Sequence, residues 1–275
     1  MSALRSRIGL PLDVFSTALK HRNLIAALAR RDISGRYRGS ALGTTWAVVT
    51  PLLMLLVYTF VFGIVFKSRW RSDSNNAFEF AVTMFSGLIV HGLLAEVVNR
   101  SPGLVTQNVN FVKKIVFPLE VLPWVAIAAA SFHFVVSFAV LLAGVALTFG
   151  TLHWSVMLAP LVMLPLVPVI LGLSWFLASL GVFLRDLPQL VPVATTVLLF
   201  LAPVFYPLTS VPEKLRWFVN VNPLTPVIEN FRAVVIWGVV PDPFGIIVYA
   251  FTATAFAWVG LLWFGATRKG FADVV

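Results

Sequence analysis

Long apolar stretches separated by short polar segments make up most of the chain. The first runs from 41 to 66, twenty-six residues without Asp, Glu, Lys or Arg. About 20 apolar residues are enough for a helix to cross the hydrocarbon core of a bilayer. The pattern predicts an all-α integral membrane protein, one transmembrane domain over 1–275, with six spans at 41–66, 80–98, 121–149, 155–184, 187–208 and 244–267.

An amphipathic segment precedes the first span. Residues 13–31 carry apolar side chains at helical spacing, while charged and polar side chains occupy the other faces. The segment ends in a basic block that opens with Arg30, Arg31 and Asp32. A basic amphipathic helix beside a span usually lies in the membrane interface. We therefore predict an interface helix at 13–31.

The segment 209–242 contains two short apolar pieces separated by a Pro-rich turn. Neither 217–221 nor 227–240 is long enough to cross a bilayer comfortably, so a re-entrant hairpin on the extracytoplasmic side is predicted. Glu229 and Arg232 are spaced i,i+3 and could pair on one helix face. A gate at the outer mouth would use Trp217, Glu229 and Arg232. If 227–240 crossed fully, the chain would have seven spans.

The distribution of basic residues predicts the orientation. With six spans, the termini and the loops on their side hold fourteen Lys and Arg, and the opposite side holds six. Basic residues stay on the cytoplasmic side, so both termini are expected in the cytoplasm. The formal charge of +9 does not indicate nucleic acid, because most basic residues flank apolar runs. Only 11% of residues are charged, against roughly 25% in a soluble domain.

Motifs for catalysis and energy conversion are missing from the sequence. There is no cysteine, and the four histidines are scattered, so neither a catalytic residue nor a metal site is predicted. No phosphate-cradling G-x-x-x-x-G-K-[ST] motif occurs, which excludes ATP binding by that route. The predicted spans other than 80–98 hold no ionisable acid, Lys or Arg in their interiors, which disfavours ion coupling.

Several blocks, in order along the chain, resemble one family of permeases. They are the run from Ala29 to Gly43 with Trp46, the stretches 51–53 and 57–63, 110–118, 183–187, 203–207 and 222–226. Together they are similar to polysaccharide-export permeases of the type-2 ABC transporter class, which export O-antigen, capsule-like glycans and teichoic acid. The similarity covers nearly the whole chain.

The resemblance implies a homodimer in the bacterial inner membrane, with two copies of a separate ATPase that binds ATP and Mg. It implies no cofactor in this chain itself. The substrate would be a long glycan on a polyprenyl diphosphate carrier, which passes between the two copies. The family's loop between spans two and three docks into the ATPase; here the docking residues would be Asn108, Asn110, Phe111, Lys113 and Lys114.

Aromatic residues suit a path for a sliding glycan, because saccharide C–H faces rest on aromatic rings. Tyr58, Phe62 and Phe66 follow one another at i,i+4 and share a helix face. With Phe200, Phe205 and Tyr206 they form the predicted channel lining. Packing or contact with lipid is the alternative role for the same residues.

Three other functions stay open at this point. An exporter of drugs or small lipids would use the same fold. A membrane-embedded glycosyl- or acyltransferase would need a catalytic group, for which Glu96 and His133 are the candidates. A passive channel or scaffold would work without an ATPase partner.

Overall fold

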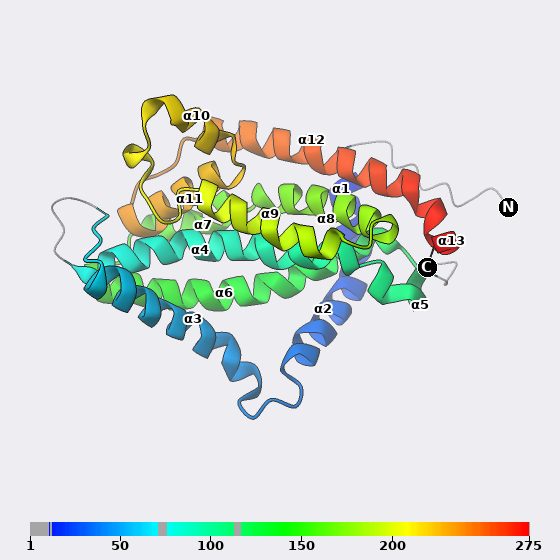
Figure 1. Cartoon of the computed structure of the whole chain (residues 1–275), viewed down its shortest axis with the longest axis horizontal. Helices are drawn as coiled ribbons and strands as arrows, with labels where there is room; N and C mark the ends of the chain where they lie inside the picture. Colours follow the sequence, from blue (N-terminus) through cyan, green and yellow to red (C-terminus); the bar gives the residue numbers. More distant parts are fainter. Residues whose placement is uncertain (1–10, 12, 71–75, 113–116, 275) are drawn as a thin grey trace.

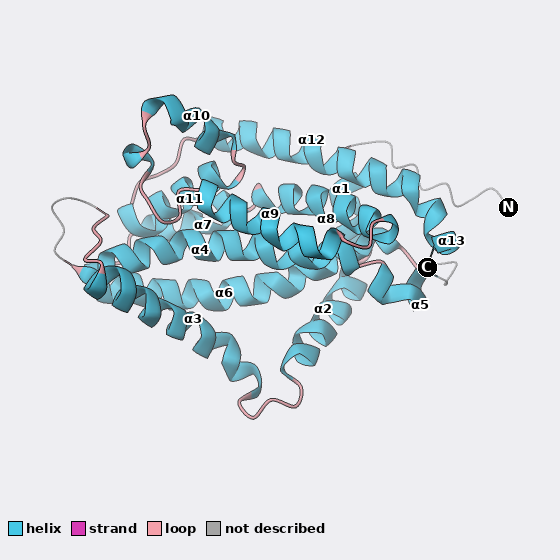
Figure 2. Ribbon diagram, in the orientation of Figure 1, coloured by secondary structure: helices cyan, strands magenta, loops and turns pink. Residues whose placement is uncertain are grey.

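The computed structural model describes residues 11, 13–70, 76–112 and 117–274. Every regular element in this part of the chain is a helix, and no strand occurs in it (Figures 1 and 2), which confirms the all-α prediction. Within it, five helical segments are long and apolar enough to cross a membrane: Gly43–Val65, Phe78–Gly103, Leu119–Phe149, Trp154–Phe183 and Pro243–Gly270.

The helix α4 (Ala77–Arg100) lies at the centre of the bundle, with α6 (Leu122–Phe149), α8 (Leu166–Phe183) and α9 (Leu187–Leu201) around it (Figure 1). In its most apolar window 78% of the residues are buried, compared with 11% in the segment Gly43–Val65. Because α4 is covered by protein, its polar side chains can find partners there. The His91 ring nitrogen Nε2, for example, lies 2.9 Å from the Thr195 carbonyl oxygen of α9.

Two glycines allow α8 and α12 (Pro243–Thr267) to pack closely. A Cβ added at Gly260 would lie 2.6 Å from the Gly172 carbonyl oxygen, so neither position leaves room for a side chain against the other helix. Small residues at helix crossings are typical of membrane bundles, where van der Waals packing drives association.

The predicted interface helix 13–31 is two helices, α1 (Asp13–Lys20) and α2 (Arg22–Tyr37), which are separated at His21. The helix α2 continues past the predicted end, and the chain leaves it at Arg38, whose backbone is extended, and Gly39, whose φ is +84°. A positive φ costs glycine little, so the turn forms here. Together α2 and α3 (Trp46–Tyr58) form a V that points away from the bundle (Figure 1).

The predicted fifth span is shorter than expected. We predicted 187–208, but α9 ends at Leu201 and Ala202 is extended (φ −85°, ψ 152°). Pro203 follows, and the residue before a proline is disfavoured in the helical region. The helix therefore has 15 residues, fewer than the about 20 that span a bilayer alone, so the predicted fifth span is not confirmed, whereas the predicted span 244–267 corresponds to Pro243–Gly270.

The segment 209–242 forms α10 (Glu213–Val221), α11 (Leu224–Arg232) and the π-helix η8 (Ala233–Trp237). The Asn222 side chain accepts a hydrogen bond from the Leu224 backbone N–H (3.0 Å) and so caps the start of α11. In Figure 1, α10 and α11 lie at one end of the bundle, opposite α5 (Val109–Val112) and α13 (Phe271–Val274).

The remaining described elements are short helices that extend or join these: η1 (Gly43–Thr45), the π-helix η2 (Thr59–Val65), η3 (Ser101–Gly103), η4 (Thr106–Asn108), η5 (Leu119–Val121), η6 (Trp154–Leu158), α7 (Ala159–Met163), η7 (Leu208–Ser210) and η9 (Arg268–Gly270).

Candidate functional site

One end of the bundle carries a small cavity between α2, α4, α5 and α6, lined by both polar and apolar side chains. Its volume is about 100 Å³. The cavity brings together two groups of predicted residues, Arg31 and Asp32 of the interface helix with Asn108 and Phe111 of the docking loop. The six other lining residues are Leu28, Arg100, Leu104, Leu122, Val125 and Ala126. Arg30, also predicted, is exposed and lies outside this lining.

An ion pair fixes α2 to the end of α4 at this cavity. The Arg100 guanidinium forms a bidentate ion pair with the Asp32 carboxylate, with Nη1–Oδ2 at 2.8 Å and Nη2–Oδ1 at 2.9 Å. Both side chains are about one third exposed, with relative areas of 34% and 31%. Exposed pairs of this kind contribute about 0–1 kcal/mol, so the pair sets the position of α2 without locking it.

The described part of the predicted docking loop, up to Val112, is held by contacts within the chain. Phe111 stacks on Phe117 with ring centroids 4.3 Å apart, so one of its faces is already covered. Asn108 donates a hydrogen bond back to the Leu104 carbonyl oxygen (2.9 Å), while Asn110 is exposed. Lys113 and Lys114 lie outside the described residues. Docking by these five residues stays a prediction.

At the opposite end, the predicted channel aromatics form one connected cluster. Phe62 is at its centre, with ring centroids 6.5 Å from Tyr58, 5.8 Å from Phe66 and 6.4 Å from Phe205. Phe200 stacks on Phe205 at 5.3 Å. Spans far apart in sequence therefore contribute to one aromatic surface, which we call the outer aromatic cluster (Tyr58, Phe62, Phe66, Phe200 and Phe205). Tyr206, also predicted, is linked to it by a hydrogen bond from its hydroxyl to the Phe200 carbonyl oxygen (3.2 Å).

The π-helix η2 shapes this cluster. It carries Phe62, and its wider turn is accompanied by a hydrogen bond from the Thr59 hydroxyl to the Leu55 carbonyl oxygen (2.8 Å). Such π-helical turns are rare and frequently occur at functional sites. Phe66 and Phe200 leave 66% and 62% of their surfaces exposed, so the cluster has accessible ring faces.

Arg232 connects the outer elements to one another. Its side chain is 1% exposed, and its Nη1 donates to Glu229 Oε1 at 2.6 Å, the pair that the i,i+3 spacing predicts. Its Nη2 donates to the Pro203 carbonyl oxygen at 3.0 Å, and its guanidinium carbon lies 4.3 Å from the centre of the Trp70 ring. Trp217, the third predicted gate residue, lies on α10 with its ring against Phe218.

The comparison with known families identifies the chain. Residues 23–236 match the model of the ABC-2 type transporter family. This chain belongs to that family. The match runs from the start of α2 through η8, so it includes both the cavity at Asp32 and Asn108 and the outer aromatic cluster.

Individual relatives of this ABC-2 family member carry names from polysaccharide transport. The chain is 27% identical over 259 residues to the O-antigen export system permease protein RfbA of Myxococcus xanthus, covering 93% of this chain and 96% of the relative. It is 27% identical over 256 residues to RfbA of Klebsiella pneumoniae (92% and 95%). It is 24% identical over 240 residues to the polysialic acid transport protein KpsM of Escherichia coli (86% and 90%).

Sequence reasoning missed some partners of the predicted residues in this ABC-2 chain. Trp70 and Phe80 extend the outer aromatic cluster, with centroids 5.6 Å apart, and Trp70 also covers Arg232. A tryptophan inside the polar stretch after the first span was the available indication. Arg36 was part of the basic block but was not singled out, although it pairs with Glu96. Within the described residues, no group of three His, Asp or Glu side chains could hold a metal.

Proposed function

We propose that this chain is the transmembrane subunit of an exporter that moves a polyprenyl-diphosphate-linked polysaccharide, of O-antigen type, across the bacterial cytoplasmic membrane. The observation that carries the proposal is the similarity to O-antigen export permeases over more than 90% of the chain. The outer aromatic cluster supports it, because ring faces contact saccharides weakly and without dependence on the sugar sequence.

The same proposal includes six spans with both termini in the cytoplasm. The helix α9 would be the fifth span, extended to the outer surface by residues 202–207. The hairpin of α10 and α11 would be re-entrant, and the α11 face with Leu224, Val227, Ile228 and Phe231 is buried in the bundle. This burial supports a segment that stays within protein rather than crossing alone.

Cysteine labelling tests this orientation cleanly, because the chain has no cysteine. Ser210 and Ser34 are both exposed side chains, and they lie on opposite sides of the proposed topology. In intact cells a membrane-impermeant thiol reagent should label Ser210→Cys and spare Ser34→Cys, and permeabilised cells should label both. Labelling of Ser34→Cys alone in intact cells would show that the orientation is the reverse of the proposed one.

Energy would come from two copies of a separate ATPase, which bind ATP and Mg and dock at the loop with Asn108, Asn110 and Phe111. The chain itself contributes the route, lined by two copies in a homodimer. The segment Gly43–Val65 supports this arrangement, since its apolar residues are mostly exposed in a single copy and can be covered by a second copy or by lipid. The helix α2 would lie in the interface and move with the loop, to which the cavity at Asp32 joins it.

Charge reversal tests the docking surface. The double change Lys113→Glu and Lys114→Glu should weaken pull-down of the ATPase about tenfold or more, because like charges would then face acidic residues on the partner. The matched control is Arg69→Glu with Lys214→Glu, two exposed cations on the opposite side of the proposed topology. Equal retention of the ATPase by both double variants would exclude docking at this loop.

Gene deletion tests the substrate. Without this chain, the surface glycan should be lost while lipid-linked glycan accumulates inside the cell, as measured by surface staining and by extraction of membrane lipids. Restoration should require both this chain and the ATPase. An exporter of drugs or small lipids predicts normal surface glycan, a transferase predicts no lipid-linked precursor, and a passive channel predicts restoration without the ATPase.

A further inference from the structure

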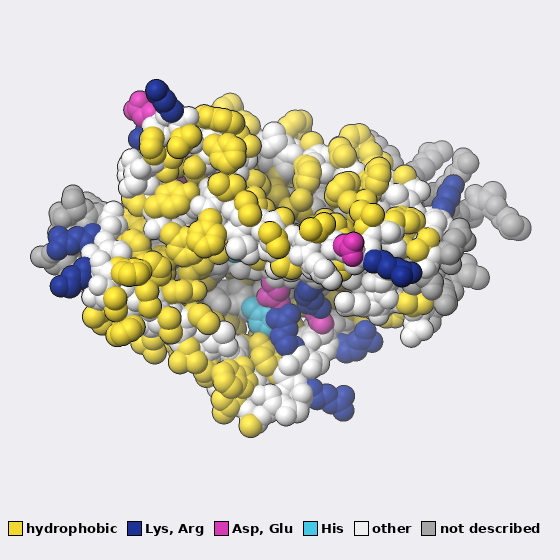
Figure 3. Space-filling view, in the orientation of Figure 1, with side chains coloured by type: hydrophobic (Ala, Val, Ile, Leu, Met, Phe, Trp, Pro, Cys, Tyr) yellow, Lys and Arg dark blue, Asp and Glu magenta, His cyan; other side chains and the backbone are white. Residues whose placement is uncertain are grey.

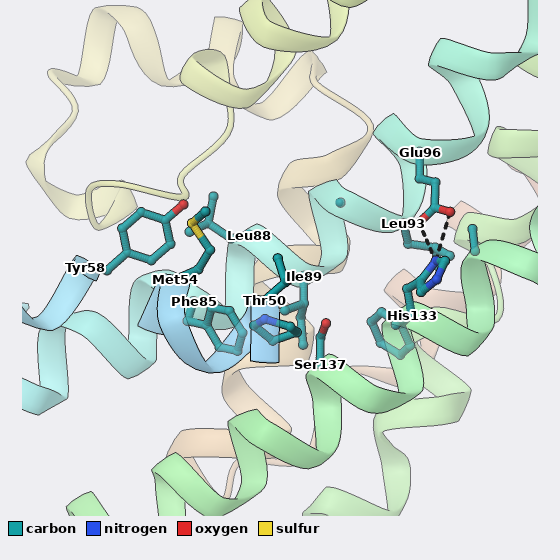
Figure 4. Close-up of a pocket in the computed structure, with 14 residues that line it drawn as sticks. Thr50, Met54, Tyr58, Phe85, Leu88, Ile89, Leu93, Glu96, His133 and Ser137 are labelled. Carbon is teal, nitrogen blue, oxygen red and sulfur yellow. Dashed lines mark hydrogen bonds and ion pairs between the residues drawn. The ribbon is translucent and has the colours of Figure 1, made fainter. Parts of the chain in front are cut away.

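A groove lies between α3, α4 and α6 (Figure 4). It shares only Tyr58, at one end of the groove, with the outer aromatic cluster. Its volume is about 280 Å³, close to the lower end of the range for small-molecule sites, about 300–1,000 Å³. Met54, Tyr58 and Phe85 line one end, and Glu96 and His133 line the other. The groove is therefore amphipathic along its length.

The polar end is a network that includes α2. Arg36 Nη2 lies 2.8 Å from Glu96 Oε1, and His133 Nδ1 lies 3.0 Å from the same oxygen. The Tyr37 hydroxyl lies 2.9 Å from His133 Nε2. Basic, acidic and histidine side chains gather in a hollow of the apolar surface, between α9 and the α2–α3 V (Figure 3). The Arg36 side chain is 40% exposed, so a molecule in the hollow can reach it.

In one of the two neutral tautomers of His133, this network has a donor without an acceptor. Burial raises the pKa of Tyr37, so its hydroxyl keeps its proton and can donate to His133 Nε2. When Tyr37 donates this bond, the proton of His133 is on Nδ1 and the ring donates to Glu96. Arg36 Nη1, 3.1 Å from the same Nδ1, consequently faces another N–H rather than an acceptor. An anionic oxygen beside Arg36 would satisfy this donor, and a charge-assisted bond of this kind is among the stronger ones.

The dimensions of the groove match one leaflet of a bilayer. Phe85 and Glu96 are eleven residues apart on α4, which corresponds to about 16 Å along a helix. Half of the hydrocarbon core is about 15 Å. The polar end is the one closer to Arg100, the end of α4 that the proposed topology puts in the cytoplasm. A long polyprenyl chain would extend beyond the groove, whereas an ordinary acyl chain would fit within it.

The charge of α2 favours an anionic headgroup. The helix and the residue that follows it carry Arg22, Arg30, Arg31, Arg36 and Arg38, against Asp32 as their one acid. Basic side chains near the cytoplasmic leaflet attract anionic lipids by about 1 kcal/mol each.

We propose that this groove binds an anionic phospholipid of the cytoplasmic leaflet, with its phosphate at Arg36 and one acyl chain between α3 and α4. The second chain stays in the bilayer. The lipid bridges α2, which carries the headgroup contact, and α3, which covers the chain. The site depends on the orientation under the proposed function but not on the exported cargo, so it can fail or hold independently of glycan export.

Photo-crosslinking tests the site in the full-length protein reconstituted into nanodiscs. The probes are phosphatidylglycerol and phosphatidylcholine, each with a diazirine in one acyl chain. Phosphatidylglycerol should label the side chains of Met54 and Leu88 about fivefold more than phosphatidylcholine does, the ratio that corresponds to about 1 kcal/mol from one arginine. Arg36→Gln should remove this preference.

Two variants separate a specific site from general effects. Arg38→Gln removes the same charge two residues away and should keep most of the preference, because Arg36 is the arginine that contacts the lining residues Glu96 and His133. Gly92→Leu should abolish labelling of the groove by both lipids, because Gly92 lines it and a Cβ there meets no atom within 4 Å. Labelling of the exposed Leu56 on α3 and Phe60 on η2, resolved by residue from labelling at Met54, serves as the internal reference.

Three results would overturn the proposal. One is equal labelling of the groove by both lipids, and another is equal loss of preference in Arg36→Gln and Arg38→Gln. The third is displacement of phosphatidylglycerol by a substoichiometric long-chain polyprenyl phosphate, which would assign the groove to a carrier lipid instead. Loss of glycan export in the deletion strain affects none of these outcomes.

Discussion

Replacing Arg232 with methionine is expected to lower the Tm of the purified protein by roughly 5–10 °C and to abolish export. The guanidinium is 1% exposed and donates to Glu229 and to the Pro203 carbonyl oxygen. Methionine keeps much of the volume but leaves these acceptors without their donor. Removing one partner of a buried pair costs about 3–5 kcal/mol; because Glu229 is 38% exposed and partly hydrated, we expect about 2–3 kcal/mol.

The Tm shift follows from this free energy, since 1 kcal/mol corresponds to about 2–4 °C in a chain of this size. The reason for the loss of export is positional: Arg232 joins α11 to the 202–207 segment and to Trp70, so the outer aromatic cluster loses its support. Lys214→Met, which removes an exposed cation from α10, should change the Tm by about 1–2 °C, as surface substitutions do. Similar Tm values for the two variants would mean that Arg232 does not organise this end.

Replacing Gly181 with alanine should destabilise the protein and weaken ATPase binding together. A Cβ at this position of α8 would lie 2.1 Å from the Pro102 carbonyl oxygen and 2.7 Å from its Cα, both backbone atoms of η3. A backbone cannot yield as a flexible side chain does, so η3 has to move. Overpacking costs about 1–3 kcal/mol, and we expect the upper part of this range, with Tm as the measurement.

The effect on ATPase binding follows from the chain path. The segment η3 leads directly into η4 and α5, and Ser101 of η3 is held to α8 by a hydrogen bond to Ser174 Oγ (2.8 Å). Moving η3 would break this bond and displace the proposed docking loop. Gly92→Ala is the matched control, because a Cβ there meets nothing within 4 Å. If Gly181→Ala kept full ATPase binding despite a lowered Tm, the position of the docking loop would not depend on the contact between η3 and α8.

Aromatic pairing shows where sequence reasoning was sufficient and where it stopped. The spacing of Tyr58, Phe62 and Phe66 placed them on one helix face, since the helical period is a local property. Their meeting with Phe205 and Phe80 depends on how α4 and the end of α9 are placed, which no local pattern encodes. The π-helical turn in η2 was not predicted either, because a π-helix has no characteristic amino-acid composition that a sequence pattern would show.

The predicted helix boundaries were wrong where the backbone preferences of single residues competed with hydropathy. The apolar run 187–208 is long enough for a span, but the Ala202–Pro203 step ends α9 early. Residues 13–31 have an amphipathic pattern, yet the helix is interrupted at His21 and resumes until Gly39 turns the chain. A hydrophobicity average over a window does not register either event.

The sequence by itself determined the solvent, the class and the orientation that we propose, because long apolar runs and the positions of Lys and Arg act through the bilayer and need no tertiary contact. Only the tertiary structure decided which spans are central, that Arg232 joins three outer segments, and that Arg36, Glu96 and His133 meet beside an apolar groove. The reason is that in lipid all faces of a span can be apolar, so hydropathy alone does not show which face meets protein.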